Sequence, residues 1–261
     1  MLRVRPLVHT PDLHGAARFL QALGLVPAQD PAPNGSYAVF DAGSGRVAVH
    51  ACVAGRAEDG TTDLAFDVAD VREFARRTAE AGARVTVELS DEGRGLAARI
   101  TAPDGLSFLA EAGPRETGVP PSPLSVLALW YTPRVGPAVR VLGDIGAKPR
   151  ISPDAVTRHD FRAKNGGLVA VRTDARTRAE LAFEYDGDVR DRVRDLTAGG
   201  FEPVVTDGSH GRSLRVRAPW GAEVRIDGWQ RDSRDSPEHC SPDSATGRRT
   251  ARRLPRAEPL G

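Results

Sequence analysis

The sequence predicts an α+β fold in which four βαβββ units pair into two domains. The main observation behind it is an internal duplication. Gly167 follows Gly45 by 122 residues, and Gly221 follows Gly105 by 116. Four short motifs recur in the same order: Thr-Pro, Gly-x-Val-Ala-Val in varied form, acid-Leu-Ala-Phe and Ala-Pro-x-Gly. A repeat this long indicates duplicated domains, because solenoid repeats span only about 20–50 residues.

The first unit is predicted from alternation, helical spacing and turn residues. A strand is expected at residues 2–9. Thr10-Pro11 then opens a helix with Thr as its cap, and Gly24 ends it. Three further strands are expected at 26–28, 37–41 and 46–53. This order of elements is β-α-β-β-β.

The second unit repeats that order. A strand is expected at residues 62–68, and Asp70 with Glu73 resembles a capping box at the start of a helix. Gly82 ends this helix. The three strands that follow are expected at 84–89, 97–101 and 106–110, with a Pro-Asp-Gly hairpin turn between the last two.

The second half repeats both units. A strand at 124–131 leads into a helix, which Gly136-Pro137 should delay or kink. The pair His159-Asp160 lies on an expected strand, so the two side chains face opposite ways. Asp188 opens the fourth helix, and the final strands are expected at 201–205, 213–217 and 222–226.

The domain boundaries follow from composition. We expect a first domain at residues 1–112, a linker rich in proline and glycine at 113–123, and a second domain at 124–230. The remaining stretch, 231–261, is polar and basic without periodicity, which is typical of a disordered tail.

Composition narrows the function classes. The formal net charge is +1, so no global field favours a nucleic-acid partner. No stretch approaches the roughly 20 apolar residues of a membrane span. Two cysteines and a polar start to the chain predict a reduced, cytoplasmic protein. We expect a monomer or a homodimer with a small-molecule ligand.

The arrangement of motifs resembles the vicinal oxygen chelate superfamily, which includes glyoxalase I, bleomycin-resistance proteins and extradiol dioxygenases. The residues that carry the resemblance are His9-Thr10-Pro11-Asp12-Leu13, Leu23-Gly24-Leu25, 64–70 and Pro103-Asp104-Gly105. It covers residues 2–228 and implies that paired units enclose a cavity. In the enzymes of this superfamily, the resemblance implies a divalent metal there, held by His, Glu or Gln from the first and last strands.

In the first half, the ligand positions implied by this resemblance are only partly kept. They fall at Arg5, Asp63, Leu109 and, with a register uncertain by one, His50. Arginine offers no lone pair and leucine no donor, although Glu111 lies on the same strand face as Leu109. A metal, if present, would therefore use His50, Asp63 and Glu111. His9 is either a hydrogen-bonding group at the cavity rim or a partly exposed histidine at the end of a strand.

In the second half, the equivalent positions are Leu127, Arg172, Glu180 and Arg225. A single carboxylate between arginines favours an ion pair or an anion-binding surface over a metal site. Tyr131 ends the first strand of this half, where an aromatic ring with a polar tip suits either a cleft wall or ordinary packing.

Three functions remain open. The first is a metal-free binder of a small organic molecule, similar to bleomycin-resistance proteins. The second is a lyase, isomerase or extradiol-dioxygenase-like enzyme that uses Fe, Mn, Ni or Zn on unorthodox ligands in the first domain. The third is a structural or partner-binding relic. The ligand-binding residues expected for the first are Arg5, His9, His50, Asp63, Tyr131, Arg172, Glu180 and Arg225.

Overall fold

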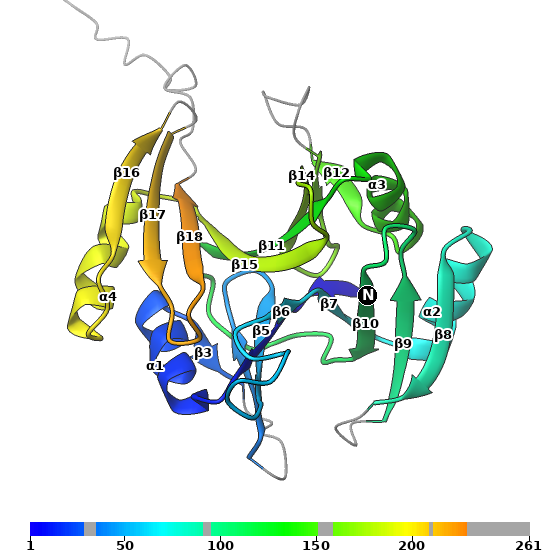
Figure 1. Ribbon diagram of the computed structural model, residues 1–261, viewed down its shortest axis with the longest axis horizontal. Coiled ribbons are helices and arrows are strands. Elements are labelled where there is room, and N and C mark those ends of the chain that lie inside the picture. The colour runs from blue at the N-terminus through cyan, green and yellow to red at the C-terminus, as the bar shows by residue number, and fades with distance from the viewer. Residues whose placement is uncertain (29–34, 91–94, 151–158, 209–210, 229–261) are drawn as a thin grey trace, which may run out of the picture. The chain divides into compact units, whose positions relative to one another are not determined.

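The protein is described here from a computed structural model, shown in Figure 1. The described residues are 1–28, 35–90, 95–150, 159–208 and 211–228. Residues Met1–Gln230 form one compact unit. The predicted α+β class is confirmed. The predicted tail at 231–261 lies outside the described residues, and the division of residues 1–230 at 113–123 stays a prediction.

The first unit contains the predicted elements in the predicted order: β1 (Leu2–Val4), β2 (Leu7–Thr10), α1 (Leu13–Leu23), β3 (Val26–Pro27), β4 (Tyr37–Asp41) and β5 (Arg46–Ala51). The predicted first strand is divided at Pro6, which has no N–H to donate. The helix cap is Asp12 and not Thr10: the Asp12 carboxylate accepts a hydrogen bond from the Gly15 N–H.

The second unit follows the same order: β6 (Thr62–Asp63), β7 (Ala65–Val68), α2 (Val71–Glu80), β8 (Arg84–Leu89), β9 (Leu96–Thr101) and β10 (Ser107–Ala112). Asp70 caps α2 as predicted, by accepting a hydrogen bond from the N–H of Glu73. The side chain of Glu73 pairs with Arg76 and Arg77 on the next turn.

The third and fourth units make up the second half: β11 (Leu124–Thr132), α3 (Val135–Asp144), β12 (Lys148–Arg150), β13 (His159–Arg162), β14 (Leu168–Thr173), β15 (Arg178–Tyr185), α4 (Val193–Ala198), β16 (Val204–Gly208), β17 (Gly211–Arg217) and β18 (Glu223–Gly228). A 3₁₀ turn at Val189–Arg192 precedes α4. The predicted delay of α3 is wrong. Pro137 lies in its first turn, where the missing N–H has no intrahelical acceptor to lose.

Pairing between units is the same in both halves. In the second half, β11 and β15 run antiparallel from Leu124↔Tyr185 to Tyr131↔Arg178. In the first half, the β1–β7 ladder starts at Leu2↔Val68, and β2–β6 continues it to Val8↔Thr62 in the same register. A further bridge, Ala179↔Thr62, joins β15 to β6 and so connects the halves.

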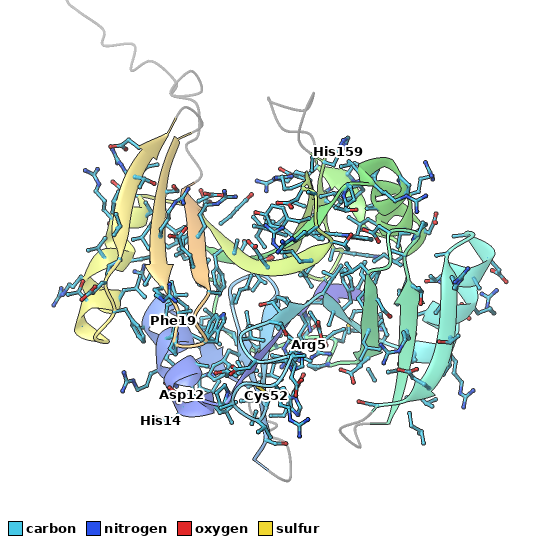
Figure 2. The ribbon with its side chains drawn as sticks, viewed as in Figure 1. Arg5, Asp12, His14, Phe19, Cys52 and His159 are labelled. Carbon is cyan, nitrogen blue, oxygen red and sulfur yellow. The ribbon has the colours of Figure 1, made fainter. Side chains whose placement is uncertain are left out.

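Buried aromatic residues connect one half to the other at two places. Phe19 of α1 is fully buried and makes edge-to-face contacts with Phe201 and Trp220, at centroid distances of 5.0 and 5.3 Å. Figure 2 shows Phe19 on the side of α1 that faces the β17–β18 hairpin, whereas His14 lies on the outer side. On the opposite junction, the indole N–H of Trp130 donates to Asp104 at 2.9 Å. Each buried aromatic side chain contributes about 1.5–3 kcal/mol.

The duplicated glycine turns touch each other. Gly45 and Gly167 occupy equivalent places in the two halves, and their φ angles are +86° and +82°. A Cβ atom added to Gly45 would lie 2.9 Å from the Gly167 Cα and 2.9 Å from the Val126 Cβ. Only glycine fits this contact, because the backbones themselves meet there.

We predict that Gly45→Ala lowers the free energy of unfolding by at least about 3 kcal/mol, through left-handed strain plus overpacking. The matched control is Gly105→Ala, at φ +91° with no atom within 4 Å of the added Cβ. The control should lose only the free energy of the left-handed backbone strain, about 1–2 kcal/mol. Urea unfolding measures both variants, and equal losses contradict the described contact between the turns.

Candidate functional site

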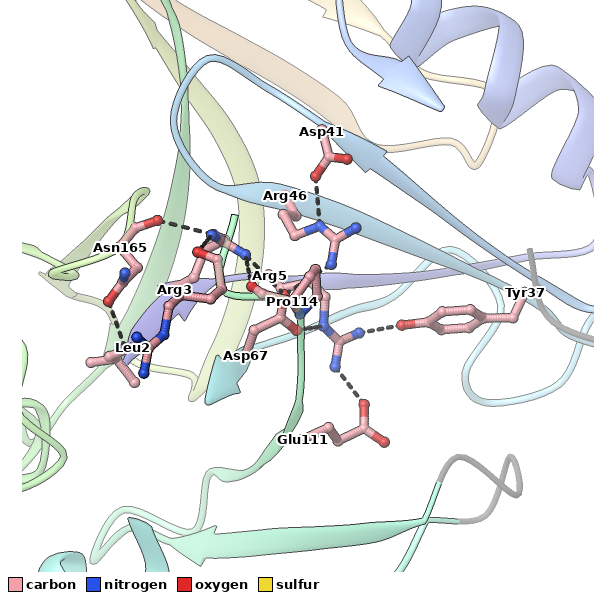
Figure 3. A network of polar contacts seen from close by, with 11 residues as sticks. Leu2, Arg3, Arg5, Tyr37, Asp41, Arg46, Asp67, Glu111, Pro114 and Asn165 are labelled. Atoms are coloured by element: carbon pink, nitrogen blue, oxygen red, sulfur yellow. Dashed lines mark hydrogen bonds and ion pairs between the residues drawn. The ribbon is translucent and has the colours of Figure 1, made fainter. Parts of the chain in front are cut away.

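The centre of the first half is a buried arginine. Arg5 lies between β1 and β2, and its residue is 2% exposed. Its Nε donates to Asp67 Oδ1 at 2.6 Å, and its two terminal nitrogens donate to the Tyr37 hydroxyl and to Glu111 Oε2. Figure 3 shows these three partners around one guanidinium. They come from β7, β4 and β10, so Arg5 ties the first unit to the second.

Other buried charges surround this arginine. Arg46 donates to Asp41 at 2.6 Å and to Asp67 Oδ2 at 3.2 Å. Arg3 lies 4.0 Å from Asp67, and its guanidinium also donates to the carbonyl groups of Pro114, Arg115 and Asn165. The cluster therefore holds three guanidinium groups and three carboxylates, all buried: Arg3, Arg5, Arg46, Asp41, Asp67 and Glu111.

The pKa of Arg5 shows how strongly the cluster favours its charge. Burial alone would lower the pKa of this guanidinium, but the Tyr37 oxygen and the carboxylates of Asp67 and Glu111 raise it well above its ordinary value. Arg5 is therefore a permanent cation. Arg5 stands at a ligand position that the family resemblance implies, and its guanidinium brings to that position a charge of the same sign as that of a metal ion.

The donors that remain in the first half do not suit a metal at this centre. Glu111 reaches it from the predicted strand face, but its Oε2 accepts from Arg5 and its Oε1 from Ser90 at 2.7 Å. Within the described ranges, no group of three or more His, Cys, Asp or Glu side chains converges in a way that could hold a metal ion. His50, Asp63 and Glu111 are thus not brought into one group.

His9 of β2, Asp63 of β6 and His50 of β5 lie on three neighbouring strands of the sheet that continues into the second half through β15. His9 Nε2 lies 3.0 Å from Asp63 Oδ2. The rings of His9 and His50 are in edge-to-face contact, with centroids 5.5 Å apart. His9 Nδ1 is buried and has no hydrogen-bond partner among the described residues. The choice between a polar group at a cavity rim and a partly exposed histidine at a strand end stays a prediction.

A cavity of about 910 Å³ opens beside this histidine. It lies where β6, β15 and the β17–β18 hairpin come together. The residues that give it chemical character are His9, Glu58, Asp63, Glu180, Trp220 and Glu223. Of the predicted ligand-binding residues, His9, Asp63 and Glu180 therefore share one cavity, to which both halves contribute.

The predicted residues of the second half gather around Tyr131. Burial raises the pKa of the Tyr131 phenol, as does the charge of Glu180, whereas Arg225, Arg178 and Arg172 lower it. Arg178 lies over the ring, 4.1 Å from its centroid, and donates to Glu180 at 2.7 Å. The apolar floor beside Tyr131 contains Leu127 and Leu129.

The two remaining arginines have acidic partners that the sequence analysis missed. Arg172 pairs with Asp160 at 2.7 Å, and Arg225 lies 3.1 Å from Asp227. Glu180 itself pairs with Arg178, at 2.7 Å, and not with Arg172 or Arg225. In the first half, Tyr37, Asp67 and Arg46 were not predicted from the sequence. Alternating charges inside apolar strands, as in Leu-Arg-Val-Arg and Ala-Phe-Asp-Val, were the available signal.

Comparisons with known proteins address the fold. No protein-family model matches this sequence, and no curated protein is similar enough to it to count as a relative. Among solved structures, the chain is similar to a catechol 2,3-dioxygenase, with a TM-score of 0.59 and 15% identity, over 88% of this chain and 90% of the other. The 2,3-dioxygenase LapB from Pseudomonas sp. KL28 is similar with a TM-score of 0.57 and 15% identity, over 87% of this chain and 91% of the other.

A third similar structure is the Mn(II)-bound glyoxalase from Novosphingobium aromaticivorans, with a TM-score of 0.56 and 19% identity, over 87% of this chain and 80% of that one. Together with the four βαβββ units, these similarities show that the chain has the vicinal oxygen chelate fold. At such identities, the likeness concerns the fold and not the chemistry. None of the described helices is long and apolar enough to cross a membrane.

We predict that Arg5→Met lowers the free energy of unfolding by about 3–5 kcal/mol, because it leaves buried carboxylates without their cation. The control is Arg76→Met on the exposed face of α2. Arg76 forms its ion pairs with Glu73 and Glu80 in water, so this variant should lose far less free energy of unfolding. Chemical unfolding monitored by circular dichroism measures both.

Proposed function

We propose that this protein binds a small organic molecule in the 910 Å³ cavity between its halves, without a metal at the centre of the Arg5 cluster. The observation that carries the proposal is the position of Arg5. Its guanidinium takes the place toward which β4, β7 and β10 direct Tyr37, Asp67 and Glu111, and it is hydrogen-bonded to all three. A guanidinium has no lone pair for a metal.

Size and shape support the cavity as the binding place. Pockets for small molecules usually measure about 300–1,000 Å³ and combine apolar walls with a few convergent polar groups. Here the polar groups are His9, Asp63 and Glu180, and the apolar wall includes Trp220 and Leu181. The cavity lies between the halves, where ligand sites are common.

Each predicted residue then has a role. Asp63 orients the His9 ring through the 3.0 Å contact, which leaves Nδ1 for a polar group of the ligand or a water. His50 supports the ring of His9 from its edge. Arg5 holds the sheet and does not contact the ligand. Tyr131, Arg172 and Arg225 form a second polar group on the sheet of the second half.

A metal-dependent enzyme is the second candidate. The observation that favours it is the similarity in fold to extradiol dioxygenases and to an Mn(II)-bound glyoxalase. Its ligands would have to come from the neighbouring strands β2, β5 and β6, which carry His9, His50 and Asp63, since the carboxylates of Asp67 and Glu111 already bind Arg5. Such an enzyme would act on the same ligand, in the same cavity.

Metal analysis separates the two candidates. We predict that protein purified without chelator carries far less than one equivalent of Fe, Mn, Ni or Zn by mass spectrometry, and that added divalent ions do not raise its melting temperature. Stoichiometric metal that is lost in Asp63→Ala but retained in the distant Asp144→Ala control would overturn the metal-free proposal.

A further inference from the structure

The cavity has an uneven charge. Four carboxylates line it, from Glu58, Asp63, Glu180 and Glu223, whereas Arg178 supplies the one lining guanidinium among the described residues. The acids come from separate places: the loop before β6, β6 itself, β15 and β18. The negative charge therefore surrounds the space instead of meeting at one point.

The arginine does not balance these acids. Its Nε donates to Glu180 at 2.7 Å, its Nη1 lies 3.0 Å from Asp174, and its guanidinium covers the Tyr131 ring. Asp174 lies outside the cavity, so Arg178 divides its charge between a wall carboxylate and a group elsewhere. Glu223 has a partner in Arg215, at 2.9 Å, but both side chains are largely exposed and this pair is screened by water.

Among the described residues, two buried polar atoms of the cavity lining have no hydrogen-bond partner: His9 Nδ1 and the indole Nε1 of Trp220, whose residue is only 5% exposed. Buried polar groups in proteins are normally hydrogen-bonded, so unpartnered ones beside a cavity indicate that something else satisfies them. In the tautomer that donates Nε2–H to Asp63, His9 Nδ1 carries a lone pair and can accept from a cationic N–H group. The Trp220 N–H is a donor, so water or an acceptor atom on the ligand would have to satisfy it. The indole also gives the cavity a large apolar surface next to the acids.

We infer that the ligand of this cavity is an organic cation: an amine or amidine carried on a flat or apolar body. The carboxylates attract the positive group, and Trp220 with Leu106 and Leu181 contacts the body. A bare metal ion does not suit this space, because among the described residues no three of its acidic or histidine side chains converge as metal ligands would. This inference rests on the proposed binding function and names the class of its ligand.

The test compares probes of matched shape and opposite charge. The probes are sets of three aromatic molecules of similar shape, one cationic, one neutral and one anionic; tryptamine, 3-ethylindole and indole-3-propionate form one such set. Each probe is added to the full chain, and its binding is measured by calorimetry and by thermal shift. We expect measurable binding by cationic members, weaker binding by neutral members and no binding by anionic members. Asp63→Asn and Glu180→Gln should each weaken binding of the cationic probes by about three- to tenfold.

Glu80→Gln is the control, since Glu80 is an exposed acid on α2 that pairs with Arg76 away from the cavity. It should leave the affinity for cations unchanged. Binding of anionic or neutral members in preference to cations overturns the inference but leaves the proposed binding function in place. Failure of every cationic member, or equal weakening in all three variants, also overturns it, whereas the metal analysis separately tests the metal-free part of the proposed function.

Discussion

The structure of the first half depends on the ion cluster around Arg5. A guanidinium and two carboxylates buried among strands are costly to remove from water, and only their mutual hydrogen bonds offset that cost. Because Asp67, Tyr37 and Glu111 belong to three different strands, satisfying Arg5 also fixes those strands relative to β1 and β2. The cluster thus performs structurally what a bound metal does in many sites: it gathers oxygen atoms from several elements around one positive charge.

The two copies of the duplicated scaffold carry different polar chemistry. Their turns are equivalent enough for Gly45 and Gly167 to meet backbone to backbone. Their polar centres are not: the first half holds the Arg5 cluster, and the second holds Tyr131 between a partly exposed Arg178–Glu180 pair and a largely buried Arg172–Asp160 pair. The cavity at their junction takes His9 and Asp63 from one copy and Glu180 from the other. Backbone geometry was therefore kept in the duplication while the side chains of the sites diverged.

Much of this fold could be predicted from the sequence, because Thr-Pro, Gly and Pro-Asp-Gly signals are local and recur in both halves. Arg5 and the polar positions of the second half were predicted as ligand positions that the family resemblance implies, and Glu111 followed from strand alternation. The contacts of Asp67 and Tyr37 with Arg5 could not be predicted, since they depend on register between strands that are distant in sequence. The position of the cavity was hidden for the same reason: it forms where two halves pack.

The most direct test of the central claim is a thermodynamic cycle between Arg5→Met and the double change Asp67→Asn with Glu111→Gln, measured by chemical unfolding. If Arg5 acts as the internal cation of the first half, the combined variant is more stable than the sum of the separate losses predicts, by about 2–3 kcal/mol. Losses that add to within about 0.5 kcal/mol would contradict that role for Arg5.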